Sequence, residues 1–309
     1  MVAASTVAAS TVDSPVDLNR ILAGAQLPAL PQSALRILEL SQNPANGPPE
    51  FAVPIEADPG LAGQVLKFVN SAYFGFAREI SSVKLAITMV GIRTIKNFAL
   101  WSAVFSLMPN PKCGPFDLRS LWQDSLRRAL FARAFARLLG VRDAEEPFAA
   151  ALLQDMAVPL LAKELPSEYA DLLSRRDNGK ARLSQLEQDR FGWTHADAAS
   201  QMARQWNLPP EFADLIARHT EIERLTADGK SRPEQLAVAL SSLLPVASDE
   251  GWHECGQFAA TYHQLSPADG PTVVDFLEKI DLEFIEFAPV LKITAPAKSL
   301  LTCYAEATA

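Results

Sequence analysis

The chain has 309 residues, of which 49% are hydrophobic and 21% charged, as is typical of a globular protein with a substantial core. Its net charge of -8 argues against nucleic-acid binding and against adhesion to anionic lipid, because both need a basic surface. No apolar run approaches the ~20 residues that span a bilayer, and the three cysteines form no C-x-x-C pair, as expected in a reducing cytoplasm.

Residues 1–17 lack the basic segment of a secretory signal and are expected to form a flexible leader. After them, apolar residues recur at helical spacing, and prolines or capping residues mark where helices begin. Asp58 precedes Pro59 as a helix cap, and Ser81 or Ser82 caps a short helix that stops at Gly91. These signals predict helices over about 31–43, 59–69, 82–91 and 93–107.

The second half is also helical. Asp117 can cap a long helix that ends at Gly140, and Pro147 opens a helix that carries Gln154 and Asp155. Further amphipathic segments cover about 195–206, 210–219, 233–244 and 271–288. No alternating strand pattern competes with them, so the sequence predicts an all-α fold.

Asp155 poses the main question about function, because it interrupts an apolar stretch, ALLQDMAVPLL. A buried carboxylate must reach water or find a partner. Asp155 could therefore be a metal ligand, part of an altered active site, or an acid that stabilises the fold. Pro159, four residues later, is expected to break or restart the helix.

Other polar residues also allow two interpretations. Asn70, Ser71 and Tyr73 follow a predicted helix and could recognise a partner, although a helix C-terminal signal explains them as well. Five arginines on the long helix could bind phosphate, but a solvated face is the favoured interpretation in an acidic chain. They are Arg119, Arg127, Arg128, Arg133 and Arg137.

Several segments together resemble the HDOD family, a relative of the HD-type metal phosphohydrolases that is usually found in bacterial signalling proteins. The resemblance runs from about residue 18 to 220. Its motifs are LPALPQSALRILEL, ADPGLAGQVLKFVNSAYFG, ISSVKLAITMVGIRTIKNFAL, LWQDSLRRALFARAFARLLG, AALLQDMAVPLL and FGWTHADAASQMARQWNLPPEF. It implies an N-terminal helical lobe at 18–110 and an HD-like lobe at 116–225. Residues 226–309 would form a C-terminal helical extension.

In active HD enzymes, a His, a His-Asp pair and a more distant Asp hold the metal that activates water. The resemblance places Asp124 at the first His position and Gln154-Asp155 at the pair. Two imidazoles are therefore missing, which implies neither catalysis nor a cofactor, and Asp155 is expected to be a relic kept for structure that accepts hydrogen bonds. A partial set of Asp124, Asp155 and His195 could hold a hard cation weakly. His195, next to the predicted cap Thr194, is favoured as a hydrogen-bonding residue of the first helical turn.

These observations predict a cytoplasmic, non-catalytic regulator that binds a signalling protein, such as a response regulator or a cyclic-di-GMP pathway component. The alternatives are a phosphohydrolase with an altered metal site and a nucleotide sensor without turnover. No nucleic acid or membrane is expected as a partner. The residues expected to bind the partner are Asn70, Ser71, Tyr73, Arg93 and Lys96.

Overall fold

The computed structural model describes residues 16–25, 27–289 and 291–309. Within these ranges the chain forms α-helices and no strand, which confirms the all-α prediction. The predicted leader, 1–17, lies outside the described residues except for its last two. Of these, Asp17 caps the first helix, and the carbonyl of Val16 accepts a hydrogen bond from Trp193 at 2.7 Å.

The helices of the N-terminal lobe begin at the caps that the sequence indicates. The Asp58 carboxylate accepts a hydrogen bond from the amide of Leu61, and the Ser82 hydroxyl accepts one from Leu85. Gly91 separates two helices with a φ of 91°, a conformation that favours glycine. The helices are α1 (Leu18–Gly24), α2 (Gln32–Ser41), α3 (Pro48–Glu56), α4 (Pro59–Val69), α5 (Val83–Val90) and α6 (Ile92–Leu107).

The HD-like lobe begins with the longest helix, α7, whose first amides are capped by Asp117. The sequence analysis did not predict α10, α11 and α14. The helices are α7 (Leu118–Leu138), α8 (Glu145–Leu153), α9 (Val158–Glu164), α10 (Pro166–Arg175), α11 (Leu183–Phe191), α12 (His195–Gln205), α13 (Pro210–Ala217) and α14 (Ile222–Asp228).

The C-terminal helices cover the outer side of α7. Both α15 and α17 pack against α7, and α15 also packs against α8. The helices are α15 (Pro233–Ser241), α16 (Cys255–Leu265), α17 (Val273–Phe287) and α18 (Leu300–Thr308).

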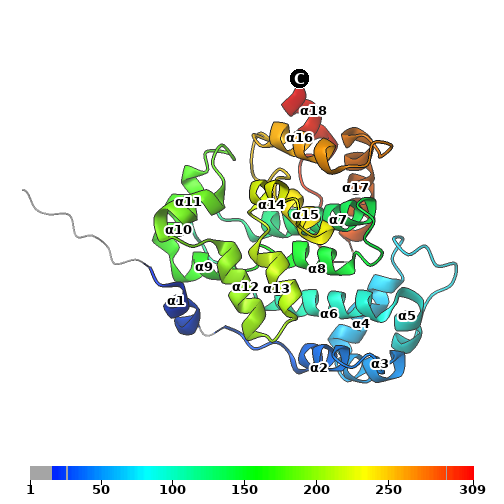
Figure 1. Cartoon of the computed structure of the whole chain (residues 1–309). Helices are drawn as coiled ribbons and strands as arrows, with labels where there is room; N and C mark the ends of the chain where they lie inside the picture. The colour runs from blue at the N-terminus through cyan, green and yellow to red at the C-terminus, as the bar shows by residue number, and fades with distance from the viewer. Residues whose placement is uncertain (1–15, 26, 290) are drawn as a thin grey trace, which may run out of the picture.

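The helices stack in layers around α7 and α8 (Figure 1). In this view α2 and α3 lie at the bottom, α6 lies above them beside α4 and α5, α8 and α7 follow upward, and α16 and α18 lie at the top. The contacts of α6 with α8 join the N-terminal lobe to the rest. Because other helices surround α7, side chains along it are buried, and Ala129, Ala132 and Ala136 have no exposed surface.

This position of α7 corrects the expectation of a solvated arginine face. Arg127, Arg128 and Arg133 are buried, and only Arg119 and Arg137 are exposed. The buried guanidinium groups bind the Lys298 carbonyl, the Asp155 carboxylate and the Glu283 carboxylate, respectively. These partners come from distant parts of the chain, so the charge pattern of one helix could not indicate them.

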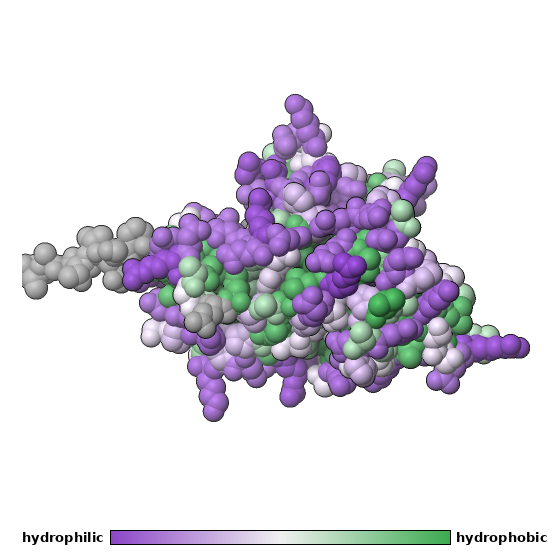
Figure 2. Space-filling model, turned by 90° about the horizontal axis from the view of Figure 1, so that it is seen from below, coloured by the Kyte–Doolittle hydropathy of each residue, from purple (hydrophilic) through white to green (hydrophobic). Residues whose placement is uncertain are grey.

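On the face seen from below, hydrophobic residues form small patches among hydrophilic ones (Figure 2). The large hydrophobic side chains that are exposed among the described residues are Val53, Leu85, Met89, Val274, Leu282 and Ile285. Of the helices in the described part of the chain, none combines the length and the apolar character needed to cross a membrane.

Candidate functional site

Asp155 lies in a buried turn that joins α8 to α9. Pro159 falls in the first turn of α9, where its missing N–H costs nothing, whereas inside a longer helix it would remove a hydrogen bond. The expected restart at Pro159 is therefore confirmed, whereas the expectation that the preceding helix carries Gln154 and Asp155 is wrong, because α8 ends at Leu153. The turn leaves Asp155 only 5% exposed, so its carboxylate depends on protein partners.

Arg128 of α7 is the charged partner of Asp155. Its Nη1 donates to Asp155 Oδ2 in a buried ion pair. Burial raises the pKa of Asp155, but Arg128 and the neighbouring histidines outweigh this effect and hold the pKa well below its ordinary value. Asp155 is thus an ionised acid held by hydrogen bonds.

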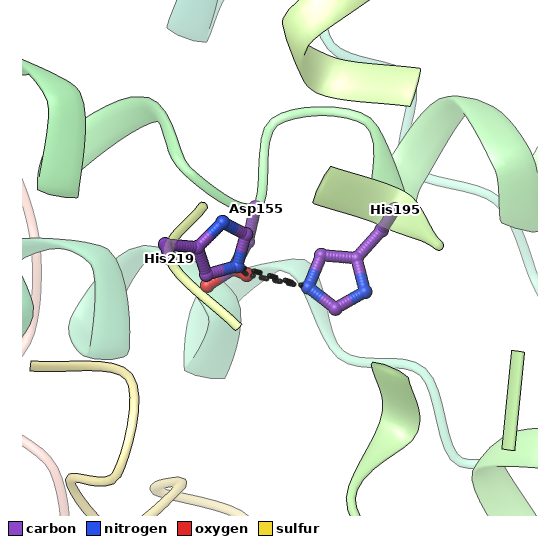
Figure 3. A group of neighbouring side chains, drawn as sticks. All are labelled: Asp155, His195 and His219. Atoms are coloured by element: carbon purple, nitrogen blue, oxygen red, sulfur yellow. Dashed lines mark hydrogen bonds and ion pairs between the residues drawn. The ribbon is translucent and has the colours of Figure 1, made fainter. Parts of the chain in front are cut away.

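Two histidines face the other oxygen of Asp155, as Figure 3 shows. His195 is the first residue of α12, and His219 follows the end of α13. The Nε2 atoms of His195 and His219 lie 3.2 Å and 3.4 Å from Asp155 Oδ1. The two Nε2 atoms are 3.2 Å apart. Three elements therefore bring two imidazoles and one carboxylate to a single point.

The other nitrogen of each imidazole is held by an acceptor. His195 Nδ1 lies 2.6 Å from Glu187 Oε2, which also accepts the amide of His195 at 2.8 Å. Glu187 is fully buried on α11, and its second oxygen accepts a hydrogen bond from the Tyr169 hydroxyl at 2.6 Å. His219 Nδ1 lies 2.7 Å from the carbonyl oxygen of Ile216. These contacts fix both rings with Nε2 toward Asp155.

The two imidazoles have opposite electrostatic environments. Burial lowers the pKa of His195, but Glu187 and Asp155 outweigh it and raise the pKa to about 10. For His219, burial is the largest effect and lowers the pKa. In the protein without a metal, His195 thus carries the positive charge and His219 is neutral. The expectation that His195 serves only its own helical turn is therefore wrong, because its side chain joins α11 to the Asp155 turn.

Asp124 and Gln154 do not join this cluster. Asp124 Oδ1 accepts a hydrogen bond from the Ala247 amide at 2.8 Å, and burial raises its pKa to about 7 despite Arg128. Gln154 is fully buried, and its amide has no hydrogen-bond partner among the described residues. Of the partial set of Asp124, Asp155 and His195, Asp124 therefore lies apart from the other two, and His219 is their neighbour instead.

The cluster lines a pocket of about 430 Å³. The pocket lining also contains two ion pairs, one between Arg176 and Asp249 at 2.6 Å and one between Arg182 and Glu254 at 3.0 Å. The pocket is lined in all by six carboxylates and three guanidinium groups. They belong to Asp117, Asp124, Asp155, Asp177, Asp249 and Glu254, and to Arg128, Arg176 and Arg182.

The residues singled out for partner binding lie outside the lining of this pocket. Asn70 pairs with the backbone of Ile80, at 2.7 Å to its amide and 2.8 Å to its carbonyl, and so closes the loop after α4. The Ser71 hydroxyl donates to the Phe68 carbonyl at 2.7 Å. Both side chains therefore act within their own loop.

Tyr73, Arg93 and Lys96 lie where the N-terminal lobe meets α7 and α8. The Arg133 guanidinium lies 4.9 Å from the Tyr73 ring centre. Arg93 forms an ion pair with Asp143 in the loop before α8, and Arg93 remains exposed. Lys96 is partly buried, and burial lowers its pKa more than Glu146 raises it.

Sequence analysis missed Glu187 and the roles of Arg128 and His219. Glu187 stands among the charged residues of LEQDR on a helix that the sequence analysis did not predict, and nothing nearby sets it apart. Its only signal is the position eight residues before His195, which becomes meaningful once α11 and α12 are known to be in contact.

Solved structures resemble this fold. A proposed phosphohydrolase from Shewanella amazonensis SB2B gives a TM-score of 0.67 at 20% identity, covering 88% of this chain and 97% of that one. An HDOD domain protein of unknown function from Geobacter sulfurreducens gives 0.61 at 20% identity, covering 94% and 91%. A proposed signal transduction protein from Marinobacter aquaeolei VT8 gives 0.60 at 21% identity, covering 87% and 57%. At these identities the likeness shows the fold.

Sequence comparison gives the family. An uncharacterised protein of Treponema pallidum (strain Nichols) is 22% identical over 214 residues, which are 69% of this chain and 41% of that protein. The chain therefore spans about two fifths of that relative's length. The model of the HDOD domain family matches residues 27–222, well over half of the chain. The motifs, the helical fold and this match agree, and the protein belongs to the HDOD family.

Proposed function

We propose that this protein is a non-catalytic signal-transduction regulator that acts by binding another protein. The observation that carries the proposal is the buried Arg128–Asp155 ion pair. An HD-type hydrolase needs its aspartate to hold a metal that activates water. Here a guanidinium group is bound to Oδ2 of that carboxylate, which leaves only Oδ1 for an ion. The neighbouring position, where the resemblance calls for a His, holds the fully buried amide of Gln154.

The pocket charges argue against the nucleotide-sensing alternative. Its lining has six carboxylates against three guanidinium groups and the charged His195 imidazole, and each of the three guanidinium groups is already paired with one of those carboxylates. A polyphosphate would meet surplus negative charge and would have to break existing ion pairs. The pocket therefore favours a cationic or neutral ligand over a nucleotide.

The partner that we propose is a cytoplasmic signalling protein, such as a response regulator or a cyclic-di-GMP pathway component. The signalling name of the Marinobacter protein supports this class. Among the candidate contact residues, Arg93 is the most suitable to test, because 69% of its side chain is exposed at the junction of the two lobes.

A hydrolase with an altered metal site is the rival function, since Asp155, His195 and His219 converge. To test it, the tag-free protein is loaded separately with Mn²⁺, Fe²⁺ and Zn²⁺ and assayed with cyclic dinucleotides and phosphate monoesters. We expect no turnover above the buffer control. Metal-dependent turnover that disappears in Asp155→Asn would overturn the proposal.

Partner binding is tested by pull-down from a native extract, followed by affinity measurement with the partner identified. Arg93→Glu should weaken binding. The double variant Arg93→Glu with Asp143→Arg restores the internal ion pair with its charges reversed. If Arg93 contacts the partner, the double variant should still bind the partner more weakly than the wild type does. Recovery of full affinity would show that Arg93 acts only through the fold.

A further inference from the structure

Three atoms that can accept hydrogen bonds meet at one point, and no neutral donor lies among them. They are the Nε2 atoms of His195 and His219 and the Oδ1 atom of Asp155. Ile216 offers a carbonyl and Glu187 a carboxylate, so each imidazole uses its Nδ1–H to reach an acceptor. A neutral imidazole then has only a lone pair at Nε2. The Nε2 atoms of His195 and His219 and the Oδ1 atom of Asp155 therefore form a site for one positive charge, which is a proton on His195 when no metal ion is bound.

The spacing of these atoms suits a metal ion. Their separations are 3.2, 3.2 and 3.4 Å. Ligand bonds of ~2.1 Å at angles of ~90° to ~109° place ligand atoms roughly 3.0–3.4 Å apart. One ion can therefore contact all three atoms without a change of rotamer.

We infer that Asp155, His195 and His219 form a three-ligand site for one divalent transition-metal ion. This inference rests on the proposed function, in which the ion supports no turnover. Two imidazoles and one carboxylate suit Fe²⁺, Mn²⁺, Co²⁺ or Zn²⁺, whereas Mg²⁺ and Ca²⁺ prefer oxygen ligands alone. Asp124 and Gln154 take no part in this site.

The surroundings meet the other requirements of such a site. All three ligand residues line the 430 Å³ pocket, which gives the ion an entry path and leaves positions for water or a small ligand. Glu187 and the Ile216 carbonyl orient the imidazoles, the role that outer partners have in metal sites. Arg128 binds the Oδ2 atom of Asp155 and leaves Oδ1 to the ion.

Equilibrium dialysis of the tag-free, full-length protein against Zn²⁺ tests the inference, with Mg²⁺ as the comparison ion. We expect one Zn²⁺ per chain and no Mg²⁺ at the same concentration. His219→Gln should abolish stoichiometric binding, and Glu187→Gln should weaken it by roughly tenfold or more. His263→Gln is the matched control, because His263 is exposed and distant in sequence from the cluster. Absence of Zn²⁺ binding by the wild type, or equal binding by His219→Gln, would overturn the inference.

A measurement on the wild type keeps the test independent of how the variants fold. X-ray absorption of the Zn²⁺-loaded protein should show two imidazole ligands and no sulfur. A zinc shell with sulfur, or with fewer than two imidazoles, would place the ion elsewhere and reject the site. The two proposals fail separately: metal-dependent hydrolysis would refute the proposed function and leave the metal site intact, whereas absence of binding would refute only the metal site.

Discussion

Arg128 and Asp155 depend on each other, since each is a charge with little access to water. Removing one member of a buried pair leaves the other uncompensated, which costs more than the pair itself contributes. We expect Arg128→Met to lower the free energy of unfolding by roughly 3–5 kcal/mol in a urea titration. Arg36→Met, which breaks an exposed ion pair with Glu39, should cost less than about 1 kcal/mol. Equal losses in the two variants would contradict this account.

Asp124 should make the protein less stable as the pH rises. Its pKa is about 7 in the folded protein, against 3.8 ordinarily, because burial outweighs its charged neighbours. Between about pH 4 and pH 7 the unfolded chain loses this proton while the folded chain keeps it, so the free energy of unfolding falls. Above pH 7 both states are ionised, and the loss is complete.

Asp124→Asn removes this titration and keeps an oxygen for the Ala247 amide. We expect the variant to gain stability over the wild type as pH rises from 5 to 8, by an amount on the order of 2–4 kcal/mol. Urea unfolding at both pH values measures the difference, and the exposed Asp269→Asn is the control. A constant difference between variant and wild type would show that Asp124 titrates normally.

For single residues, the sequence indicated which polar side chains lie in apolar surroundings, but it did not identify the residues that bind them. The apolar stretch around Asp155 correctly predicted a buried acid that needs hydrogen bonds. Arg128 lies 27 positions before it. Whether a charged residue of an amphipathic helix is solvated depends on what covers that helix, and α15 and α17 come from far along the chain.

Among the elements, the loop between α4 and α5 depends on Asn70. Its side chain satisfies both backbone groups of Ile80, ten residues later. Asn70→Ala should cost roughly 0.5–1.5 kcal/mol and should speed hydrogen exchange at the Ile80 amide. Asn70→Asp keeps the acceptor for that amide and should retain most of its protection. Unchanged exchange in Asn70→Ala would mean that the loop is held by its aromatic contacts alone.

Element boundaries were predictable where a side chain caps a helix or a proline starts one. Asp58, Ser82 and Asp117 each hydrogen-bond the amides that a helix N-terminus leaves free. The helices that were missed are short, and α11 and α14 have no side-chain cap hydrogen bond. Their helical state depends on packing, which no local pattern reveals.

The three parts of the molecule meet at one side chain, Arg133 of α7. Its guanidinium group lies 4.9 Å from the ring centre of Tyr73 and 4.7 Å from that of Phe148, and it forms a 3.1 Å ion pair with Glu283. These residues belong to the N-terminal lobe, to α8 and to α17. The C-terminal helices are therefore part of the core around α7.

A chain that ends at Asp228 should consequently lose cooperative unfolding, because the side of α7 that α15 and α17 cover becomes exposed. Urea titration followed by circular dichroism and by tryptophan fluorescence measures this. We expect the two signals to change together in the full chain and separately, or without a transition, in the shortened one. A chain that ends at Tyr304 loses only exposed residues and should behave like the full chain. A cooperative transition in the chain that ends at Asp228 would show that residues 16–228 fold independently.

The burial of α7 also has an evolutionary consequence. At Ala129, Ala132 and Ala136 the side chain is a single methyl group with no exposed surface, so any larger residue must push a neighbouring helix away. Substitutions at these positions would be removed by selection whatever partner or ion the protein binds. The interior of α7 should therefore diverge slowly among descendants of this gene, while exposed residues of the pocket lining, such as Asp177 and Asn178, remain free to change.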